Sequence, residues 1–387
     1  MKAKTNKILF FLSFTIITSN SFSAEEAGLF GDWGGKKTSL QESGYDFNVV
    51  YKADTVTSIR GASQNKFAFL GNVDVTLDTD LEKIFGLKGL SFFVYGLGNH
   101  GDQPSTYIGD SFVTSNIEAP NTFKAYEVYF KQQIDDRFSI LFGLRDLNAD
   151  YYSNDSGKPL INSAFGISPT LAQTGVNGPS IFPVAAPALA VSYNSPSSFY
   201  FQTALFNAQA GDPNEPKQTY IAASLENGLL SISEMGFSSE SENGNTKYGL
   251  GAWSYSKQET LSINNGWYVI IDHGFTKDFS SFLKYGSASP GVNQFSTALE
   301  LGINYKGLLS FRPEDSLVLG YAKANASDDY VRINTTTQNE SVFEVAYNIS
   351  AGSGISITPD YQLIKNPGLV LGSSSIEVLS LRFEINY

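Results

Sequence analysis

Apolar and polar residues alternate along extended stretches of this chain with the period of two that β-strands have. From Leu379 to the C-terminus, odd-numbered positions hold Leu, Leu, Phe, Ile and Tyr, whereas even-numbered positions hold Ser, Arg, Glu and Asn. The same alternation occurs at 69–81, 295–305 and 341–349. Because successive side chains of a strand point to opposite faces, each stretch predicts one apolar and one polar face.

Two architectures fit this alternation, a membrane β-barrel and a soluble β-sandwich whose polar faces are solvated. Aromatic residues make up 14% of the chain, with 21 Tyr and 29 Phe. Beyond the N-terminal region no apolar stretch is long enough for a membrane helix, so any membrane contact must come from strands. The pattern favours an all-β fold, a transmembrane antiparallel β-barrel.

Seventeen segments are predicted to be strands. They are 45–54, 69–81, 89–98, 123–134, 137–146, 186–194, 199–207, 218–226, 229–237, 246–256, 265–274, 279–286, 295–305, 315–324, 341–349, 354–363 and 379–387. Bacterial outer-membrane barrels have an even number of strands, so at least one prediction is false. Counting from both ends places the conflict between 218 and 256, and we expect about 16 strands. The longest connections are 99–122 and 147–185, and loops of that length are usually functional or disordered.

The N-terminal residues 1–23 have the features of a signal peptide. Three lysines precede the apolar run 8–17, and Ser21-Phe22-Ser23 supplies the small residues of a cleavage site. The apolar run is shorter than the about 20 residues of a membrane helix. We therefore expect a signal peptide at 1–23, an N-terminal periplasmic segment at 24–44 with a short helix near 36–43, and the barrel at 45–387.

Charge and cysteine content narrow the expected partners. The chain has 38 acidic and 26 basic residues and a formal net charge of −12 at pH 7. This is the wrong sign for binding phosphates, so no nucleic acid partner is expected. With no Cys and two His, the sequence predicts no disulfide, no metal site and no cofactor. The expected contacts are outer-membrane lipid and small solutes in transit, and the sequence leaves a monomer and a homo-oligomer both open.

Both histidines and a glycine cluster suggest enzymatic or nucleotide-binding chemistry, and none of the three meets the requirements of that chemistry. His273 follows Asp272 on a predicted strand, where adjacent side chains point to opposite faces and cannot form a catalytic array. His100 lies in a Gly-rich stretch with no nucleophile indicated nearby. The cluster from Gly31 to Thr38 has Lys37 where a phosphate-binding loop requires Ser or Thr. We therefore predict a protein that is not an enzyme, with no catalytic residue.

The order of several motifs resembles the OprB-like carbohydrate-selective porins of bacterial outer membranes. The most specific match runs from Ser115 to Asp146 and includes Glu127 and the sequence Gly143-Leu144-Arg145-Asp146. Further matches follow in family order over nearly the whole chain: Leu29 to Gly35, Asn72 to Gly89, Ile161 to Gly166, Gly251-Ala252-Trp253, Arg312 to Asp315, and Pro359 to Gly368. Two departures are Arg60-Gly61, where the family tends to have a Gly-Gly pair, and the terminal Tyr387 in place of Phe.

The resemblance implies a 16-stranded barrel in the outer membrane of a Gram-negative bacterium. It also implies facilitated diffusion of glucose and related small sugars through a lumen narrowed by inward-folded loops. The departure at Arg60 bears on the shape of the first loop and hence on sugar preference. A general or cation-preferring porin is the alternative, because carboxylate-lined lumens favour cations. A surface adhesin or a barrel hydrolase is a third possibility, although an adhesin needs longer loops.

Strand alternation then selects candidates for the constriction. It points Glu127, Tyr129 and Lys131 into the lumen and Tyr126 outward, and the next strand points Arg145 inward. The candidate substrate-binding residues are Glu127, Arg145, Asp146, Tyr129, Lys131, Asn162, Asp110 and Arg60. Guanidinium, carboxylate and phenol groups can replace the hydrogen bonds that a sugar loses with water.

The inward charged groups also have a purely structural interpretation. Glu127 and Arg145 could instead form a cross-strand pair on a wetted inner wall, contributing little to selectivity. The inward carboxylates Asp74, Asp78, Glu340 and Glu344 are predicted to be solvated wall residues.

Overall fold

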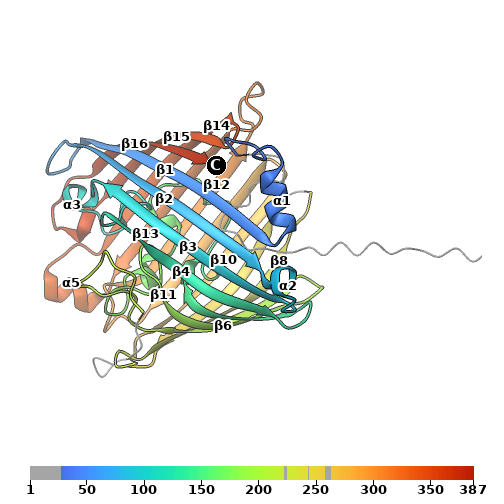
Figure 1. Ribbon diagram of the computed structural model, residues 1–387. Helices are drawn as coiled ribbons and strands as arrows, with labels where there is room; N and C mark the ends of the chain where they lie inside the picture. The colour runs from blue at the N-terminus through green and yellow to red at the C-terminus, as the bar shows by residue number, and fades with distance from the viewer. Residues whose placement is uncertain (1–27, 222–224, 243, 258–262) are drawn as a thin grey trace, which may run out of the picture.

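The computed structural model describes residues 28–221, 225–242, 244–257 and 263–387, so the predicted signal peptide at 1–23 lies outside the described residues. The chain forms one closed antiparallel barrel in which each strand pairs with its neighbours in sequence and β1 pairs with β16. Figure 1 shows the inclined strands of this barrel. The prediction of an all-β transmembrane barrel with 16 strands is confirmed.

The strands are β1 (Tyr45–Arg60), β2 (Phe67–Asp80), β3 (Leu90–Gly101), β4 (Thr122–Gln133), β5 (Phe138–Arg145), β6 (Ala186–Asn194), β7 (Phe199–Asn207), β8 (Leu229–Ser239), β9 (Thr246–Tyr255), β10 (Asn265–Thr276), β11 (Phe279–Ala288), β12 (Phe295–Lys306), β13 (Ser316–Ala326), β14 (Asn339–Gly352), β15 (Ile355–Lys365) and β16 (Ile376–Asn386). The short helices are α1 (Lys36–Glu42), α2 (Leu81–Phe85), α3 (Ser105–Ile108), α4 (Pro169–Ala172) and α5 (Asp328–Asn334). No helix within the described residues is long and apolar enough to cross a membrane.

The two ends of the barrel differ in their connections. One end, called the turn end below, carries α1, α2 and short turns such as 134–137 and 195–198. The other, called the loop end, carries α3, α5 and the longest connections, 102–121 and 146–185. Both described chain ends lie at the turn end, where the backbone N–H of Leu29 donates to the carbonyl of Asn386 at 2.7 Å.

The outer and inner faces follow the alternation of the sequence. On β16, Leu379 and Phe383 expose 43% and 39% of their surface on the outside, whereas Ser380 and Arg382 expose 6% and 8% within the barrel. This is the arrangement in which an apolar outer surface meets lipid while polar groups face inward.

One of the seventeen predicted strands is false, and it is 218–226. The described part of this segment belongs to the loop between β7 and β8. It lies along the loop end of β4, where the hydroxyl of Thr219 donates to the carbonyl of Ala125 at 2.7 Å. The pairing of β4 with β5 stops at Val128. The loop between β7 and β8 therefore covers the part of the β4 edge that β5 does not reach.

A bulge in β4 changes one predicted orientation. Tyr95 of β3 pairs with Glu127, but the next residue, Gly96, pairs with Ala125, so Tyr126 is the extra residue. Two consecutive side chains then point inward, since a bulge interrupts strict alternation. The prediction that Tyr126 faces outward is wrong: it is 2% exposed, and its hydroxyl bonds the carboxylate of Asp146 inside the barrel.

The long loop 146–185 folds into the barrel and packs against the inner wall. Near its start, Tyr151 and Tyr152 join a buried cluster with Ile270 and other wall residues of β6 to β11. Further along, Leu160 and Phe165 join a second cluster with residues from the opposite part of the wall. Apolar burial on two sides holds this loop across the lumen.

Candidate functional site

Carboxylates on the inner wall bind backbone N–H groups of the inserted loop. Glu344 on β14 accepts hydrogen bonds from the N–H groups of Ile161 and Asn162, the second at 3.0 Å. Glu234 on β8 accepts from the N–H of Tyr152 at 3.0 Å. A loop that is buried must have its backbone groups satisfied, and these carboxyl oxygens meet that requirement as acceptors.

A lysine provides the complementary contact. Lys284 on β11 is fully buried, and its ammonium donates to the carbonyls of Phe165 and Gly166, both at 2.8 Å. The wall therefore holds neighbouring parts of loop 146–185 through acceptors on β14 and a donor on β11.

The shorter inward loop, 102–121, is held in the same way. Glu340 on β14 accepts a hydrogen bond from the N–H of Ser111 in this loop at 2.8 Å. It accepts a second, also at 2.8 Å, from the N–H of Gly368 in the connection between β15 and β16. Arg382 on β16 forms a two-pronged ion pair with Asp54 on β1, with both distances 2.8 Å. Its guanidinium also donates to the side-chain oxygen of Asn116 at 2.7 Å.

These contacts correct the prediction for two of the four wall carboxylates. Glu340 and Glu344 are both 0% exposed and are bonded to loop backbone, so they are not solvated. Strand alternation predicts that a side chain points inward, but it does not predict which loop covers it. Asp74 and Asp78 are only partly buried, and Asp74 accepts the hydroxyl of Tyr95 at 2.6 Å.

Arg145, the last residue of β5, is the centre of a charged network. Its guanidinium binds both carboxylate oxygens of Asp150 at 2.8 and 2.7 Å, and it donates to Glu127 at 3.1 Å. It also donates to the Tyr129 hydroxyl at 3.2 Å and lies 4.9 Å from that ring's centre. The side chains of Arg145 and Glu127 are each 6% exposed, so the pair is buried by the loop and is not a wetted wall pair.

Asp146 continues this network into the loop. Its carboxylate accepts from the Tyr126 hydroxyl and from the N–H of Asn148, both at 2.8 Å. Its own N–H donates to Glu127 at 2.8 Å. Burial raises the pKa of the Asp146 carboxyl to about 6, although the hydrogen bonds from Tyr126 and Asn148 oppose that shift.

Three polar side chains in or beside the network still reach water. Tyr129 and Lys131, both inward on β4, are partly exposed, and the Asp150 side chain is 18% exposed. Their phenol, ammonium and carboxylate groups supply both donors and acceptors on one part of the wall. A ring of Phe93 on β3 stacks on Tyr129 at 4.9 Å between centres.

The other predicted site residues lie elsewhere. Asn162 is fully buried, and its amide donates to Gln362 at 3.0 Å while its N–H donates to Glu344. Asp110 is 8% exposed within loop 102–121. Arg60 lies at the loop end of β1 with a 79% exposed side chain, 3.6 Å from Glu377 on the adjacent strand. The structure thus brings together Glu127, Arg145, Asp146, Tyr129 and Lys131, and leaves these three apart.

Sequence reasoning missed two residues, Asp150 in the charged network and Lys284 on the wall that holds the inserted loop. Asp150 follows Arg145 by five residues and is the next carboxylate in the loop after Asp146. Lys284 is the one cation among the inward-pointing residues of β11, and the others are small or apolar. Both signals were present, but without the path of the loop neither position could be connected to the site.

A closed antiparallel barrel with an apolar outer face, a polar inner face and a loop folded into its lumen defines an outer-membrane porin. A family model described as carbohydrate-selective porin, OprB family, matches residues 64–387. The chain belongs to this family, and it is a sugar-selective porin of the Gram-negative outer membrane.

Individual relatives agree with this assignment. The chain is 24% identical to Porin B of Pseudomonas aeruginosa over 414 aligned residues, which cover 90% of this chain and 89% of that protein. The high-pH structure of Pseudomonas putida OprB has a TM-score of 0.82 at 20% identity and covers 95% of this chain and 100% of its own. A mutant of the Rh. blastica porin has a TM-score of 0.53 at 12% identity, with 89% and 100% covered. The two structural likenesses bear on the fold alone.

Proposed function

We propose that this chain is a passive channel for small neutral sugars such as glucose, and that the β3 to β5 side of its lumen selects them. The observation that carries this proposal is the network of Arg145, Glu127 and Asp150, which adjoins the partly exposed Tyr129 and Lys131. Sugar hydroxyls both donate and accept, and this face offers partners of both kinds. Contacts of this kind permit both binding and release, as conduction requires.

The residues have separate roles in this proposal. Tyr129, Lys131 and Asp150 contact the sugar because they reach water. Glu127 and Arg145 are positioning residues, since each is nearly buried and bonded to its neighbours. Asp146 joins Glu127 to the Tyr126 hydroxyl and supports the same arrangement.

The remaining predicted residues are not part of the proposed sugar contact. Asn162 and Asp110 hold or fill the inward loops, and Arg60 lies at the rim. The pathway lies within one barrel, so the proposal holds equally for a monomer and for a homo-oligomer.

The burial of carboxylates on the inner wall also favours a sugar-selective channel over a cation-selective one. The acidic balance of the sequence would favour cations if the inward carboxylates lined water. Glu234, Glu340 and Glu344 are instead 0–1% exposed and bonded to loop backbone. Fewer free negative charges then face the permeating solute than the composition suggests.

We also propose that the chain carries no enzymatic activity, and the positions of the two histidines support this. His100 packs against Tyr51 and Phe69 on the outer face of the barrel. His273 packs against Tyr248 and Phe275, while its neighbour Asp272 is buried inside. Neither ring adjoins the lumen, where a substrate would pass.

The first prediction tests the network with two substitutions of Arg145. Arg145→Ala should weaken glucose binding by about tenfold or more, because charged hydrogen bonds contribute about 1.5–3 kcal/mol each. It should also raise ion conductance and cation preference, since Glu127 and Asp150 lose their cation. Arg145→Lys keeps the charge but loses the planar fork, so it should weaken sugar binding with little change in ion preference. Bilayer recording with glucose and a salt gradient measures all three quantities.

Arg312→Ala is the matched control. Arg312 binds Asp315 with the same two-pronged geometry, at 2.8 Å for both contacts, but in the turn after β12. Breaking a buried pair costs about 3–5 kcal/mol, so heat-modifiable gel mobility must first establish that each variant is folded. If folded Arg145 variants keep the sugar affinity and ion preference of the unaltered protein, the proposed selectivity site is wrong.

A further inference from the structure

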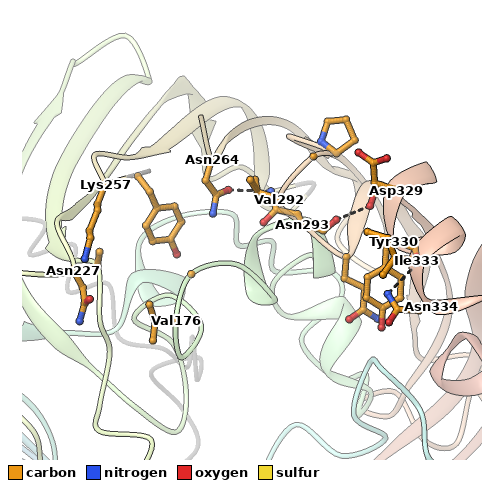
Figure 2. Close-up of a pocket in the computed structure, with 17 residues that line it drawn as sticks. Val176, Asn227, Lys257, Asn264, Val292, Asn293, Asp329, Tyr330, Ile333 and Asn334 are labelled. Atoms are coloured by element: carbon orange, nitrogen blue, oxygen red, sulfur yellow. Dashed lines mark hydrogen bonds between the residues drawn. The ribbon is translucent and has the colours of Figure 1, made fainter. Parts of the chain in front are cut away.

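A second feature, distinct from the charged network, lies at the loop end. A cavity of about 400 Å³ is bounded by loop 146–185 and by the four loops that follow β7, β9, β11 and β13. Figure 2 shows Asn264, Val292 and Asn293 between Val176 on one side and Tyr330 and Asn334 on the other. Its volume lies within the range of about 300–1,000 Å³ that is usual for small-molecule sites.

The polar lining is dominated by amides that are held in place. The Asn293 amide donates to the side-chain oxygen of Asn264 at 2.9 Å, and Ser327 donates to the Asn293 carbonyl at 2.7 Å. Asn334 donates to the carbonyl of Tyr330 at 3.0 Å. The Asn293 amide also donates to the carbonyl of Ser289 at 3.0 Å, so both of its donors are used and its position is fixed. A side-chain amide has two donors, and the Asn334 amide therefore keeps a second donor for a ligand.

The cavity is connected directly to the inserted loop. The hydroxyl of Tyr255, which lines the cavity, lies 3.0 Å from the hydroxyl of Thr174 in that loop. Gly175 follows with φ +73°, and a Cβ there would lie 2.8 Å from the Tyr255 hydroxyl. The loop backbone can approach Tyr255 this closely because residue 175 has no side chain. A solute in the cavity would therefore contact the same loop that carries Asp150.

The lining chemistry restricts the class of ligand. Asp329 is paired with Arg332 at 2.8 Å, and Lys257 stands on the far side of the cavity, so the charges do not form a cluster of one sign. Val176, Val292 and Ile333 add apolar surface beside the amides. A neutral ligand with hydroxyls on its rim and C–H groups on its faces matches this mixture, which is the chemistry of a sugar ring.

We propose that this cavity is a separate saccharide-binding site, which captures a neutral mono- or disaccharide at the mouth before it reaches the β3 to β5 face. The inference rests on the proposed function and deepens it. Two weak sites in sequence along one pathway raise the local concentration of solute without trapping it at the second.

Glucose titration followed by saturation-transfer NMR on the full-length protein tests this site. Val176 is 49% exposed and lines the cavity, so Val176→Trp should fill the space and abolish one of two glucose-binding components. Val370→Trp is the matched control, because Val370 is a 58% exposed loop-end valine outside the cavity. It should retain both components.

A second variant removes ligands without adding bulk. Asn227 and Asn334 line the cavity, and Figure 2 places them on its two sides. The double substitution Asn227→Ala and Asn334→Ala should weaken the same component about tenfold, as expected for the loss of one or two hydrogen bonds. A titration with one component in the unaltered protein, or unchanged titrations of both cavity variants, would overturn the inference. Liposome swelling by glucose tests the channel function independently, and its failure would contradict that function whatever the cavity binds.

Discussion

Asp110 illustrates how a single loop residue can make this barrel sensitive to pH. It lies in loop 102–121 and is 8% exposed. Burial raises the pKa of its carboxyl well above the ordinary value, and the nearby Glu340 and Glu118 carboxylates raise it further. The folded chain therefore holds a proton here at pH values where the unfolded chain, with a pKa of about 3.9, has lost it.

The sign of the resulting prediction follows from proton binding. Between the unfolded and the folded pKa the folded state binds more protons, so the contribution of Asp110 to stability is present at low pH and is lost as pH rises. Asp110→Asn removes this dependence. The variant should resist heat better than the unaltered protein at pH 8 and equally at pH 4, as measured by the temperature at which the folded gel band disappears. Asp136→Asn, in an exposed turn, is the control, and an equal gain at both pH values would refute the explanation.

At the scale of elements, loop 146–185 owes its position to specific wall groups as well as to apolar packing. Glu344 bonds two consecutive backbone N–H groups of this loop from β14. In Glu344→Gln an amide NH₂ group would replace one of the two acceptor oxygens. This NH₂ group would then face a backbone N–H of the loop, and neither group could accept a hydrogen bond from the other. The loss of one hydrogen bond and the unsatisfied backbone donor together cost about 1.5–4.5 kcal/mol locally.

That substitution should loosen the inserted loop without opening the barrel. We expect faster hydrogen exchange at Ile161 and Asn162, larger single-channel conductance and weaker discrimination between glucose and larger saccharides. Glu377→Gln is the matched control, because Glu377 contacts Arg60 and the Tyr361 hydroxyl and has no bond to the loop. Exchange at Ile161 that stays as slow as in the unaltered protein would show that apolar packing alone holds the loop.

The strands were more predictable than the loops for a physical reason. A strand shows its two faces in its own sequence, so β16 and the inward positions of Glu127, Tyr129 and Arg145 could be predicted. The segment 218–226 resembles a strand but lies over an edge that β5 is too short to pair. The bulge at Tyr126 and the loop contacts of Glu344 depend on distant residues, which a local pattern does not contain.

At the scale of the whole molecule, the barrel is complete only when β16 pairs with β1. Ten residues of β16 have partners in β1, from Glu377 to Asn386, and the buried pair of Arg382 and Asp54 joins the two strands inside. An unclosed barrel would leave two strand edges without hydrogen-bond partners in lipid, which is strongly unfavourable. Closure by the last strand is therefore a requirement for insertion.

The outward face of β16 is where this requirement can be tested. Leu381 points outward near the middle of the strand and Ile385 lies near the turn end. A lipid-facing arginine costs about 2–4 kcal/mol at the membrane midplane and less near the interfaces. Leu381→Arg should therefore reduce the amount of folded, heat-modifiable protein in the outer membrane more strongly than Ile385→Arg. Ser356→Arg adds the same side chain on the inner face of β15, opposite Glu384, and should assemble normally. Equal assembly of Leu381→Arg and Ser356→Arg would contradict the assignment of Leu381 to the lipid-facing side, and weaker assembly of Ser356→Arg would mean that the inner and outer faces are reversed.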